Sequence, residues 1–186
     1  MEPSKAALLF WGNRFDLIAS SCGKLLCCAL VVAGPSPSLA QALLGVQADR
    51  IIVRKAERTL TLYWHDAKLK SYRIALGGQP IGAKVSLGDQ RTPEGLYTVK
   101  RHTKQTDFHA AFDVSYPNAD DLSRAKAAGT QPGGGIEIHG LRDEFAWLGT
   151  AHQFFDWTDG CIALTNSEMD ELVRALPDGT PLEILP

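Results

Sequence analysis

Short runs of β-branched, aromatic and aliphatic residues recur along the chain from residue 51 and are separated by polar or glycine-containing turns. Runs of this length and composition are typical of β-strands. The first three are joined by short polar turns, which predicts an antiparallel meander. In chain order the expected strands are 51–53, 59–64, 69–76, 96–101, a loosely alternating stretch at 108–116, 136–139 and 182–184.

Helical periodicity is confined to the second half of the chain. Thr165 and Glu168 have the spacing of a capping box, with Thr165 as the N-cap. Four apolar residues then recur on one helical face, at Met169, Leu172, Val173 and Leu176. A shorter helix is expected over 121–128, ending at Gly129. We therefore expect one mainly β domain over residues 43–186, with one or two helices.

The first 42 residues follow a different pattern. Lys24 is followed by an apolar run over 25–34, and the triplet 40–42 reads Ala-Gln-Ala. This order of basic, apolar and small residues is typical of a secretory signal, with cleavage expected after Ala42. Ten apolar residues are few for a bilayer crossing, and a retained membrane anchor is the alternative. A lipoprotein signal is set aside because Leu26, rather than a small residue, precedes Cys27.

Charge and cysteine content then restrict the classes of function. The 186 residues hold 19 Lys and Arg against 21 Asp and Glu, and no block of basic residues stands out. We therefore expect no nucleic-acid partner. Cleavage after Ala42 leaves 144 residues with a net charge of −3 and one cysteine, Cys161. A lone thiol in an oxidising compartment is a liability unless it is buried or used.

Cys161 and His139 are the residue types from which a thiol nucleophile and its base are built. His139 ends an expected strand, and Cys161 follows Gly160. A nearby imidazole that takes the thiol proton gives a thiolate–imidazolium pair. A glycine before the nucleophile lets consecutive N–H groups point at one oxyanion. Trp147 and Trp157 are candidates to line the site. The alternative is that Cys161 is a small buried core residue.

In this order the motifs resemble the L,D-transpeptidase catalytic domain (YkuD type). His139-Gly140 and the segment 158–161, Thr-Asp-Gly-Cys, resemble the family's His-Gly and Ser/Thr-x-Gly-Cys motifs. The segment 91–97 resembles its Thr-Pro-x-Gly-aromatic segment. The resemblance extends over residues 50–186. It implies a β-sandwich-like domain that acts on bacterial peptidoglycan in the periplasm or cell envelope, without a cofactor.

The resemblance also implies a role for each site residue. Cys161 attacks the amide after the third residue of a stem tetrapeptide, and His139 is the general base. The Gly140 carbonyl orients the imidazole. The N–H groups of 159–161 form the oxyanion hole, and Thr158 belongs to the same turn. The acyl group then passes to an amine on a second stem, to a lipoprotein lysine, or to water. A monomer is expected, and a carbapenem is expected to acylate Cys161.

Two positions depart from the family pattern. Asp159 stands where many members have histidine, and Ala163 where many have arginine or asparagine. A carboxylate facing Cys161 would raise the pKa of the thiol and oppose thiolate formation. Alanine also stands at the second position in a branch described as hydrolytic. Hydrolysis of a peptidoglycan linkage is therefore the alternative within the family.

Two further alternatives belong to other classes of function. A wall-binding module could keep this fold without the chemistry, although such a module needs no thiol. A zinc peptidase would draw its ligands from His102, His109, Asp113 and His139. These residues lack the close spacing of a metal-binding motif, and we expect no metal.

Overall fold

The structure is a computed structural model that describes residues 47–186. The predicted leader, its cleavage after Ala42 and the cysteines at 22, 27 and 28 lie outside the described residues. The elements in chain order are β1 (Arg50–Arg54), β2 (Thr59–Trp64), β3 (Ala67–Arg73), β4 (Gly95–Arg101), β5 (Ala111–Val114), α2 (Ala119–Ala127), β6 (Glu137–His139), η1 (Asp143–Phe154), β7 (Ile162–Ala163), α3 (Asn166–Ala175) and β8 (Thr180–Leu185).

Eight strands form a single sheet in the order β3-β2-β1-β8-β4-β5-β6-β7. The meander β1-β2-β3 is antiparallel, as the sequence predicts, and so is the run β4-β5-β6. The final strand, β8, lies between these halves, parallel to β1 and antiparallel to β4. The last pair, β6 and β7, is parallel.

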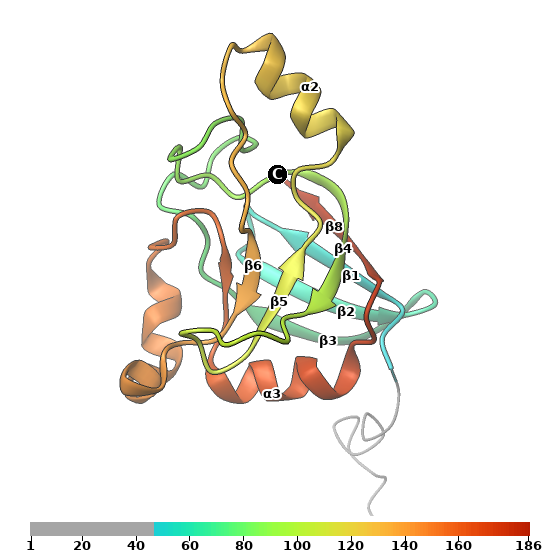
Figure 1. The fold of residues 1–186 in the computed structure, drawn as a ribbon. Helices are drawn as coiled ribbons and strands as arrows, with labels where there is room; N and C mark the ends of the chain where they lie inside the picture. Colours follow the sequence, from blue (N-terminus) through green and yellow to red (C-terminus); the bar gives the residue numbers. More distant parts are fainter. Residues whose placement is uncertain (1–46) are drawn as a thin grey trace, which may run out of the picture. The chain divides into compact units, whose positions relative to one another are not determined.

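The sheet curls until its two outer strands meet (Figure 1). Ala75, just beyond β3, forms an antiparallel bridge with Ala163 of β7. Their backbones exchange two hydrogen bonds, with N···O distances of 3.0 and 2.9 Å. Gly77 then forms a parallel bridge with Thr158. The mainly β prediction is confirmed, and the sandwich-like arrangement arises because one continuous sheet faces itself.

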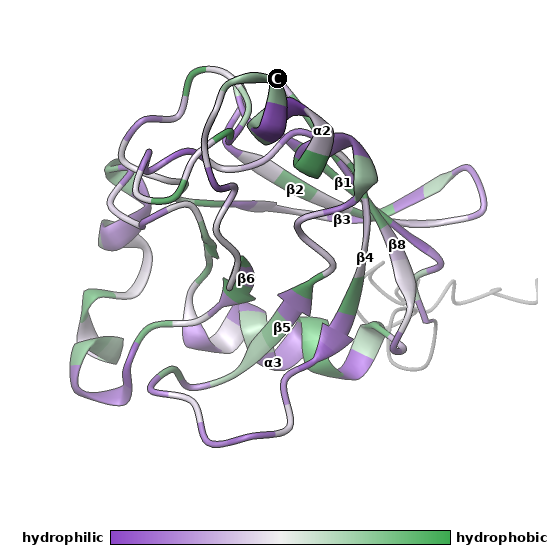
Figure 2. Cartoon of the chain, turned by 45° about the horizontal axis from the view of Figure 1, so that its top comes forward, coloured by the Kyte–Doolittle hydropathy of each residue, from purple (hydrophilic) through white to green (hydrophobic). Residues whose placement is uncertain are grey.

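The curled sheet encloses the hydrophobic core, and α3 lies along one end of it (Figure 1). Met169 and Leu172 of α3 are fully buried in this core. The predicted capping box is confirmed, because the Thr165 side chain accepts from the Glu168 N–H and Glu168 reaches back to the Thr165 N–H. Figure 2 shows hydrophobic residues along the strands, while the loop from β4 to β5 is mainly hydrophilic.

Five elements differ from the sequence prediction. The strand expected over 69–76 is β3 over Ala67–Arg73, and the stretch expected over 108–116 is the shorter β5 over Ala111–Val114. The helix α2 begins earlier, because Asn118 caps it in a second capping box with Asp121. The 3₁₀ segment η1 and the two-residue strand β7 were not predicted. η1 has no amphipathic period, and its chain bends at Gly149, where φ is 46°. None of the helices within residues 47–186 has the length and hydrophobicity required to cross a membrane.

Candidate active site

The strand pair β6 and β7 brings His139 and Cys161 to one face of the sheet. Ile138 lies opposite Ile162, and both side chains are fully buried in the core. Because successive side chains alternate between faces, His139 and Cys161 both lie on the other face. In the register His139 is opposite Ala163, two residues beyond Cys161. Cys161 directly precedes β7, so this register places His139 and Cys161 on neighbouring segments, offset by two residues.

His139 is held in one orientation by its own chain and by two aromatic rings. Its Nδ1 lies 2.7 Å from the Gly140 carbonyl oxygen, which is the contact that the resemblance implies. Phe108 stacks on the imidazole with 3.7 Å between ring centroids, and Trp157 meets it edge-on at 6.0 Å. A carbonyl oxygen can only accept, so Nδ1 carries the proton in this contact. Nε2 is then left as the basic nitrogen.

Burial lowers the pKa of His139 to about 4, although the hydrogen bond to Gly140 opposes this shift and His152 adds to it. The ring is only 1% exposed. A buried imidazole without a carboxylate partner loses more solvation when charged than when neutral. His139 is therefore neutral at pH 7, which is the protonation state of a general base ready to accept a proton.

Cys161 is a free thiol among residues 47–186 and is partly buried. Its Sγ lies 3.6 Å from the Gly135 carbonyl oxygen, which accepts from the thiol. Burial raises its pKa to about 11. The Glu137 N–H opposes this shift, the carboxylates of Glu137 and Asp159 add to it, and Lys84 opposes it. The environment favours a neutral thiol beside a neutral imidazole, in contrast to the thiolate–imidazolium pair considered from the sequence.

The turn before Cys161 is built by Thr158 and Gly160. The Thr158 hydroxyl donates to the Cys161 carbonyl at 2.7 Å and accepts from the Gly160 N–H at 3.2 Å. Gly160 has φ of 127°, and a Cβ there would lie 2.6 Å from the Arg91 carbonyl oxygen. Only glycine fits this position. The Gly160 N–H, which the resemblance assigns to the oxyanion hole, is already engaged with Thr158.

Asp159 and Ala163 are the two positions that depart from the family pattern. Its carboxylate is exposed and accepts a 3.4 Å hydrogen bond from the Gln90 side chain. It also contributes to the raised pKa of Cys161, after burial and Glu137. Ala163 is fully buried and bonded to the Ala75 backbone. It therefore leaves no polar side chain at the position where many family members have arginine or asparagine.

Glu137 is the residue of this site that the sequence analysis missed. It lies two residues before His139 in β6, so the period-2 alternation of a strand places both side chains on one face. Its carboxylate is mostly buried and lies 3.5 Å from His102 Nδ1. Burial raises the pKa of Glu137, although His102 opposes this shift. The alternation in the sequence 137–139 was the signal that could have found it.

The two tryptophans lie in different surroundings, and so do the residues considered as zinc ligands. Trp157 borders His139, whereas Trp147 is exposed on η1. The ligand atoms of His102, Asp113 and Glu137 lie within 4.8 Å of one another, and this group could hold a cation. The hydrogen bond between His102 and Asp113, at 2.8 Å, accounts for the cluster without one.

His109, another of the residues considered as zinc ligands, contacts two carboxylates away from this cluster. His109 contacts Asp143 and Asp170 at 3.1 and 2.9 Å. The four residues considered as zinc ligands are thus distributed among three separate environments.

Comparison with known proteins gives one family and a consistent fold. The family model of the L,D-transpeptidase catalytic domain (YkuD) matches residues 48–184. YafK of Escherichia coli (strain K12) is 33% identical over 130 residues, and the match covers 67% of this chain and 45% of YafK. The chain therefore corresponds to less than half the length of that relative.

Solved structures share the fold. The helical cell shape determining protein Pgp2 from Campylobacter jejuni matches with a TM-score of 0.58 and 24% identity, over 75% of this chain and 48% of Pgp2. Bd1075 of Bdellovibrio bacteriovorus matches with a TM-score of 0.53 and 22% identity, over 75% of this chain and 48% of Bd1075.

Proposed function

The chain belongs to the L,D-transpeptidase catalytic domain family, and from this premise we propose that it is an exported cysteine enzyme acting on peptidoglycan stem peptides. The observation that carries the proposal is the pairing on β6 and β7. A thiol and a neutral imidazole share one face of the sheet, and the Gly140 carbonyl holds the imidazole. Catalysis by this pair requires no metal and no cofactor.

In the proposed reaction Cys161 Sγ attacks the carbonyl carbon of the amide after the third stem residue. Its proton moves to His139 Nε2 as the C–S bond forms, because both groups are neutral beforehand. The Cys161 N–H stabilises the oxyanion, joined by the Gly160 N–H once that group leaves Thr158. His139 then protonates the departing amine, and the C–N bond breaks. D-alanine is released, and the rest of the stem stays bonded to Cys161 as the acyl-enzyme.

The acyl-enzyme is consumed by a second nucleophile, activated by the same base. An acceptor amine on another stem, or a lysine of a wall-linked lipoprotein, gives transfer, and water gives hydrolysis. Alanine at position 163 supports hydrolysis as the second candidate. Its methyl side chain is fully buried and offers no polar group that could bind an acceptor.

Mass spectrometry of purified wall fragments incubated with the full chain tests both candidates. Cross-links between third-position residues indicate transfer, and shortened stems without cross-links indicate hydrolysis. The Cys161→Ala variant is the matched control and is expected to give neither product while remaining folded. Unchanged wall fragments with the wild-type chain, together with retained binding of stem peptides, would instead indicate a wall-binding module.

One substitution and one inhibitor test the proposed catalytic pair directly. His139→Ala is expected to keep stem-peptide binding and to lose turnover by a factor of about 10²–10⁴. Wild-type turnover in His139→Ala would remove His139 from the mechanism.

A carbapenem is expected to increase the mass of the wild-type chain by that of one carbapenem molecule and to leave the mass of Cys161→Ala unchanged, because the strained ring presents an acyl carbon to the thiol.

The proposal extends to location and organisation. Residues 1–42 are proposed as a leader that directs residues 43–186 to the periplasm or cell envelope, either cleaved after Ala42 or retained as an anchor. A substrate in the cell wall requires such a location. The domain is proposed to act as a monomer.

A further inference from the structure

The backbone that directly follows His139 carries the carbonyl group that orients its imidazole, and this backbone is docked on α3. The Leu141 N–H donates to the side-chain oxygen of Asn166, the first residue of α3, at 2.7 Å. A Cβ at Gly140 would lie 2.8 Å from the same oxygen. The position of the Gly140 carbonyl therefore depends on how closely this stretch is held against α3.

His109 holds the same stretch from the other side. Its backbone N–H donates to the Leu141 carbonyl at 3.0 Å, and its Cβ would lie 3.5 Å from a Cβ at Gly140. Its ring then links two elements. Nδ1 lies 3.1 Å from the carboxylate of Asp143, the first residue of η1, and Nε2 lies 2.9 Å from the carboxylate of Asp170 in α3.

Both contacts of the His109 ring exist together only when the ring is charged. An ionised carboxylate can only accept, so each ring nitrogen must carry a proton to bond Asp143 and Asp170 at once. The bond to Asp170 is the main cause of a raised pKa for His109; burial opposes this shift, and Asp143 adds to it. The neighbouring cation, Arg142, pairs with Asp107 at 3.1 Å. A neutral ring has one N–H and must give up one of its two carboxylates.

We propose that His109 is a positioning residue of the candidate active site, whose charged ring links Asp143 to Asp170 and thereby keeps the Gly140 carbonyl aligned on His139 Nδ1. When the ring loses its proton, one link breaks and the alignment loosens. The role of His139 as a base rests on the proposed function, but the alignment itself exists without any reaction.

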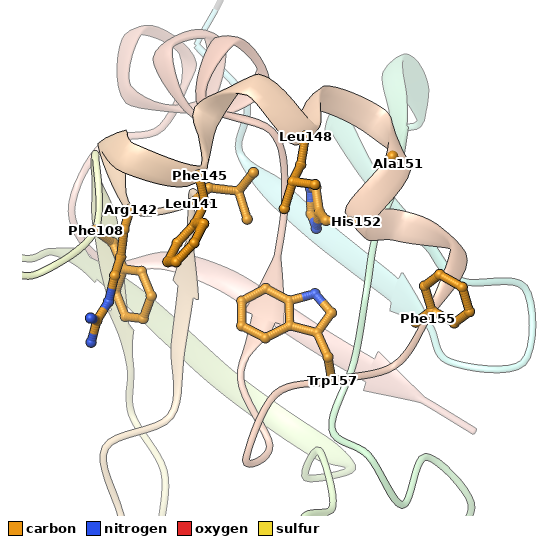
Figure 3. Close-up of a pocket in the computed structure, with 9 residues that line it drawn as sticks. All are labelled: Phe108, Leu141, Arg142, Phe145, Leu148, Ala151, His152, Phe155 and Trp157. Carbon is orange, nitrogen blue, oxygen red and sulfur yellow. The ribbon is translucent and has the colours of Figure 1, made fainter.

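The residue before His109 gives the link a second route to the imidazole. Phe108 stacks on the His139 ring. Phe108 and Leu141 also line a cavity of about 480 Å³ along the inner side of η1 (Figure 3). Loss of the link therefore affects His139 through the Gly140 carbonyl and through the stacked ring.

The pH range in which His109 acts is free of changes in the catalytic pair. The pKa of His139 is lowered to about 4 and that of Cys161 is raised to about 11, so neither group changes its predominant form between these values. The pKa of His109 lies above its ordinary value of 6.5, so the ring loses its proton as the pH rises beyond 6.5. His102, which faces Glu137, also has a raised pKa, and a variant must separate the two histidines.

NMR of the histidine rings in the full chain, labelled with ¹⁵N, tests the alignment without any reaction. The measurement is the exchange with water of the His139 Nδ1 proton, which the Gly140 carbonyl protects. The comparison is His109→Arg, because a guanidinium keeps its charge and can donate to both carboxylates. We expect equal exchange rates at about pH 6 and exchange about two- to fivefold faster in the wild type at about pH 9, the size of a surface ion pair.

The carboxylates provide a second variant that does not alter His109. Asp170→Asn keeps an acceptor for the ring and removes the charge that raises the pKa of His109. The midpoint of the His109 titration and the onset of faster His139 exchange should both move to lower pH. Asp120→Asn, at an exposed position in the first turn of α2, is the matched control and should move neither. This comparison decides the question if His109→Arg does not fold.

The rate at which a carbapenem acylates Cys161 gives a chemical readout. The ratio of the wild-type rate to that of His109→Arg should fall about two- to fivefold between about pH 6 and about pH 9. Absence of acylation together with the expected exchange rates would contradict the proposed function and still support the positioning role of His109.

Two results overturn the proposal. One is exchange of the His139 Nδ1 proton at the same rate in the wild type and in His109→Arg at both pH values. The other is a pH-dependent change that persists in His109→Arg and disappears in His102→Gln, which assigns it to the contact between His102 and Glu137.

Discussion

The pKa of the Cys161 thiol depends on groups from several segments of the chain. Burial is the main cause of its raised pKa, and the carboxylate of Glu137 adds more to it than that of Asp159. The difference follows from exposure, because Asp159 is exposed whereas Glu137 is mostly covered. Water and salt weaken the field of an exposed charge more than that of a covered one.

We predict that Glu137→Gln lowers the pKa of the Cys161 thiol, because it removes a negative charge and leaves the backbone N–H in place. The measurement is the rate of iodoacetamide modification as a function of pH, whose midpoint should move to lower pH. Asp159→Asn should shift the midpoint in the same direction by a smaller amount. A larger shift in Asp159→Asn than in Glu137→Gln would show that Asp159 is the closer charge.

At this scale the sequence analysis identified the residues of the candidate pair but not their protonation. His139 Nδ1 contacts the Gly140 carbonyl oxygen, and the turn at Gly160 requires glycine. The sequence suggested a thiolate–imidazolium pair, whereas burial favours the neutral forms of both groups. Burial of the imidazole depends on Phe108, which is distant in sequence, so no local pattern could reveal it.

Among the elements, α3 was the most predictable, because its cap and its apolar period agree. Its buried residues Met169 and Leu172 lie in the core, and the Thr165 side chain caps its first turn. The segment η1 was the least predictable. Its aromatic residues follow neither a helical nor a strand period, and its shape depends on packing against the site. Local propensity determines the first kind of element, and tertiary contacts determine the second.

Replacing Thr165 by alanine is expected to destabilise the domain by about 1 kcal/mol, because the N3 amide, that of Glu168, loses its side-chain acceptor. The change should appear as a lower urea midpoint with an unchanged slope. Thr103→Ala, at an exposed position in the loop after β4, is the control and should have a smaller effect. An equal effect of the two substitutions would contradict a specific role for the α3 cap.

Lys55 fixes the segment 77–94, which lies against the turn 158–161. This side chain is 2% exposed and donates to the carbonyls of Gly82 and Thr92, at 2.7 and 3.0 Å, and to Glu94 at 2.7 Å. Burial lowers the pKa of Lys55, although Glu94 opposes this shift.

Lys55→Met leaves a partly buried carboxylate and two carbonyls without their partner. We expect a loss of about 3 kcal/mol in the free energy of unfolding, the size observed when one member of a buried ion pair is removed. Urea unfolding monitored by circular dichroism measures it. Lys68→Met, on the exposed strand β3, is the control and should stay within about 0.5 kcal/mol of the wild type.

For the whole molecule, the buried titratable groups predict a stability maximum at neutral to mildly alkaline pH. Burial lowers the pKa of His139 to about 4, so the stability linked to this residue is complete above its ordinary value of 6.5. It is lost as the pH falls towards 4. Burial raises the pKa of Cys161 from 9.0 to about 11, so the corresponding stability is lost as the pH rises through that interval.

The urea midpoint should therefore be highest between about pH 6.5 and 9 and lower at pH 4.5 and 10.5. His102 and His109 have raised pKa values, from bonds to Asp113 and Asp170 respectively, and oppose the acid trend. Their effect is weak because both rings lie at the surface and are partly exposed to solvent. Cys161→Ala should reduce the loss above pH 9, and an unchanged loss in that variant would assign it to other groups.

The order of strands in the sheet could not be predicted from local patterns. The short polar turns between the first runs predicted the meander, but the position of β8 between β1 and β4 depends on contacts between residues far apart in the chain. The closing bridge between Ala75 and Ala163 is equally remote in sequence. Short apolar runs carry no information about which distant run they will pair with.

The central position of β8 has a consequence for how the domain is made. The ribosome delivers β8 after every other strand of the sheet, yet β8 is the strand that hydrogen-bonds to both halves. Until it emerges, the meander and the β4–β7 half lack the central strand between them and meet only at the closing bridges of Ala75 with Ala163 and Gly77 with Thr158. The sheet is therefore continuous only once its last strand has been synthesised, and the β6–β7 pair that carries the candidate site gains its full support only then.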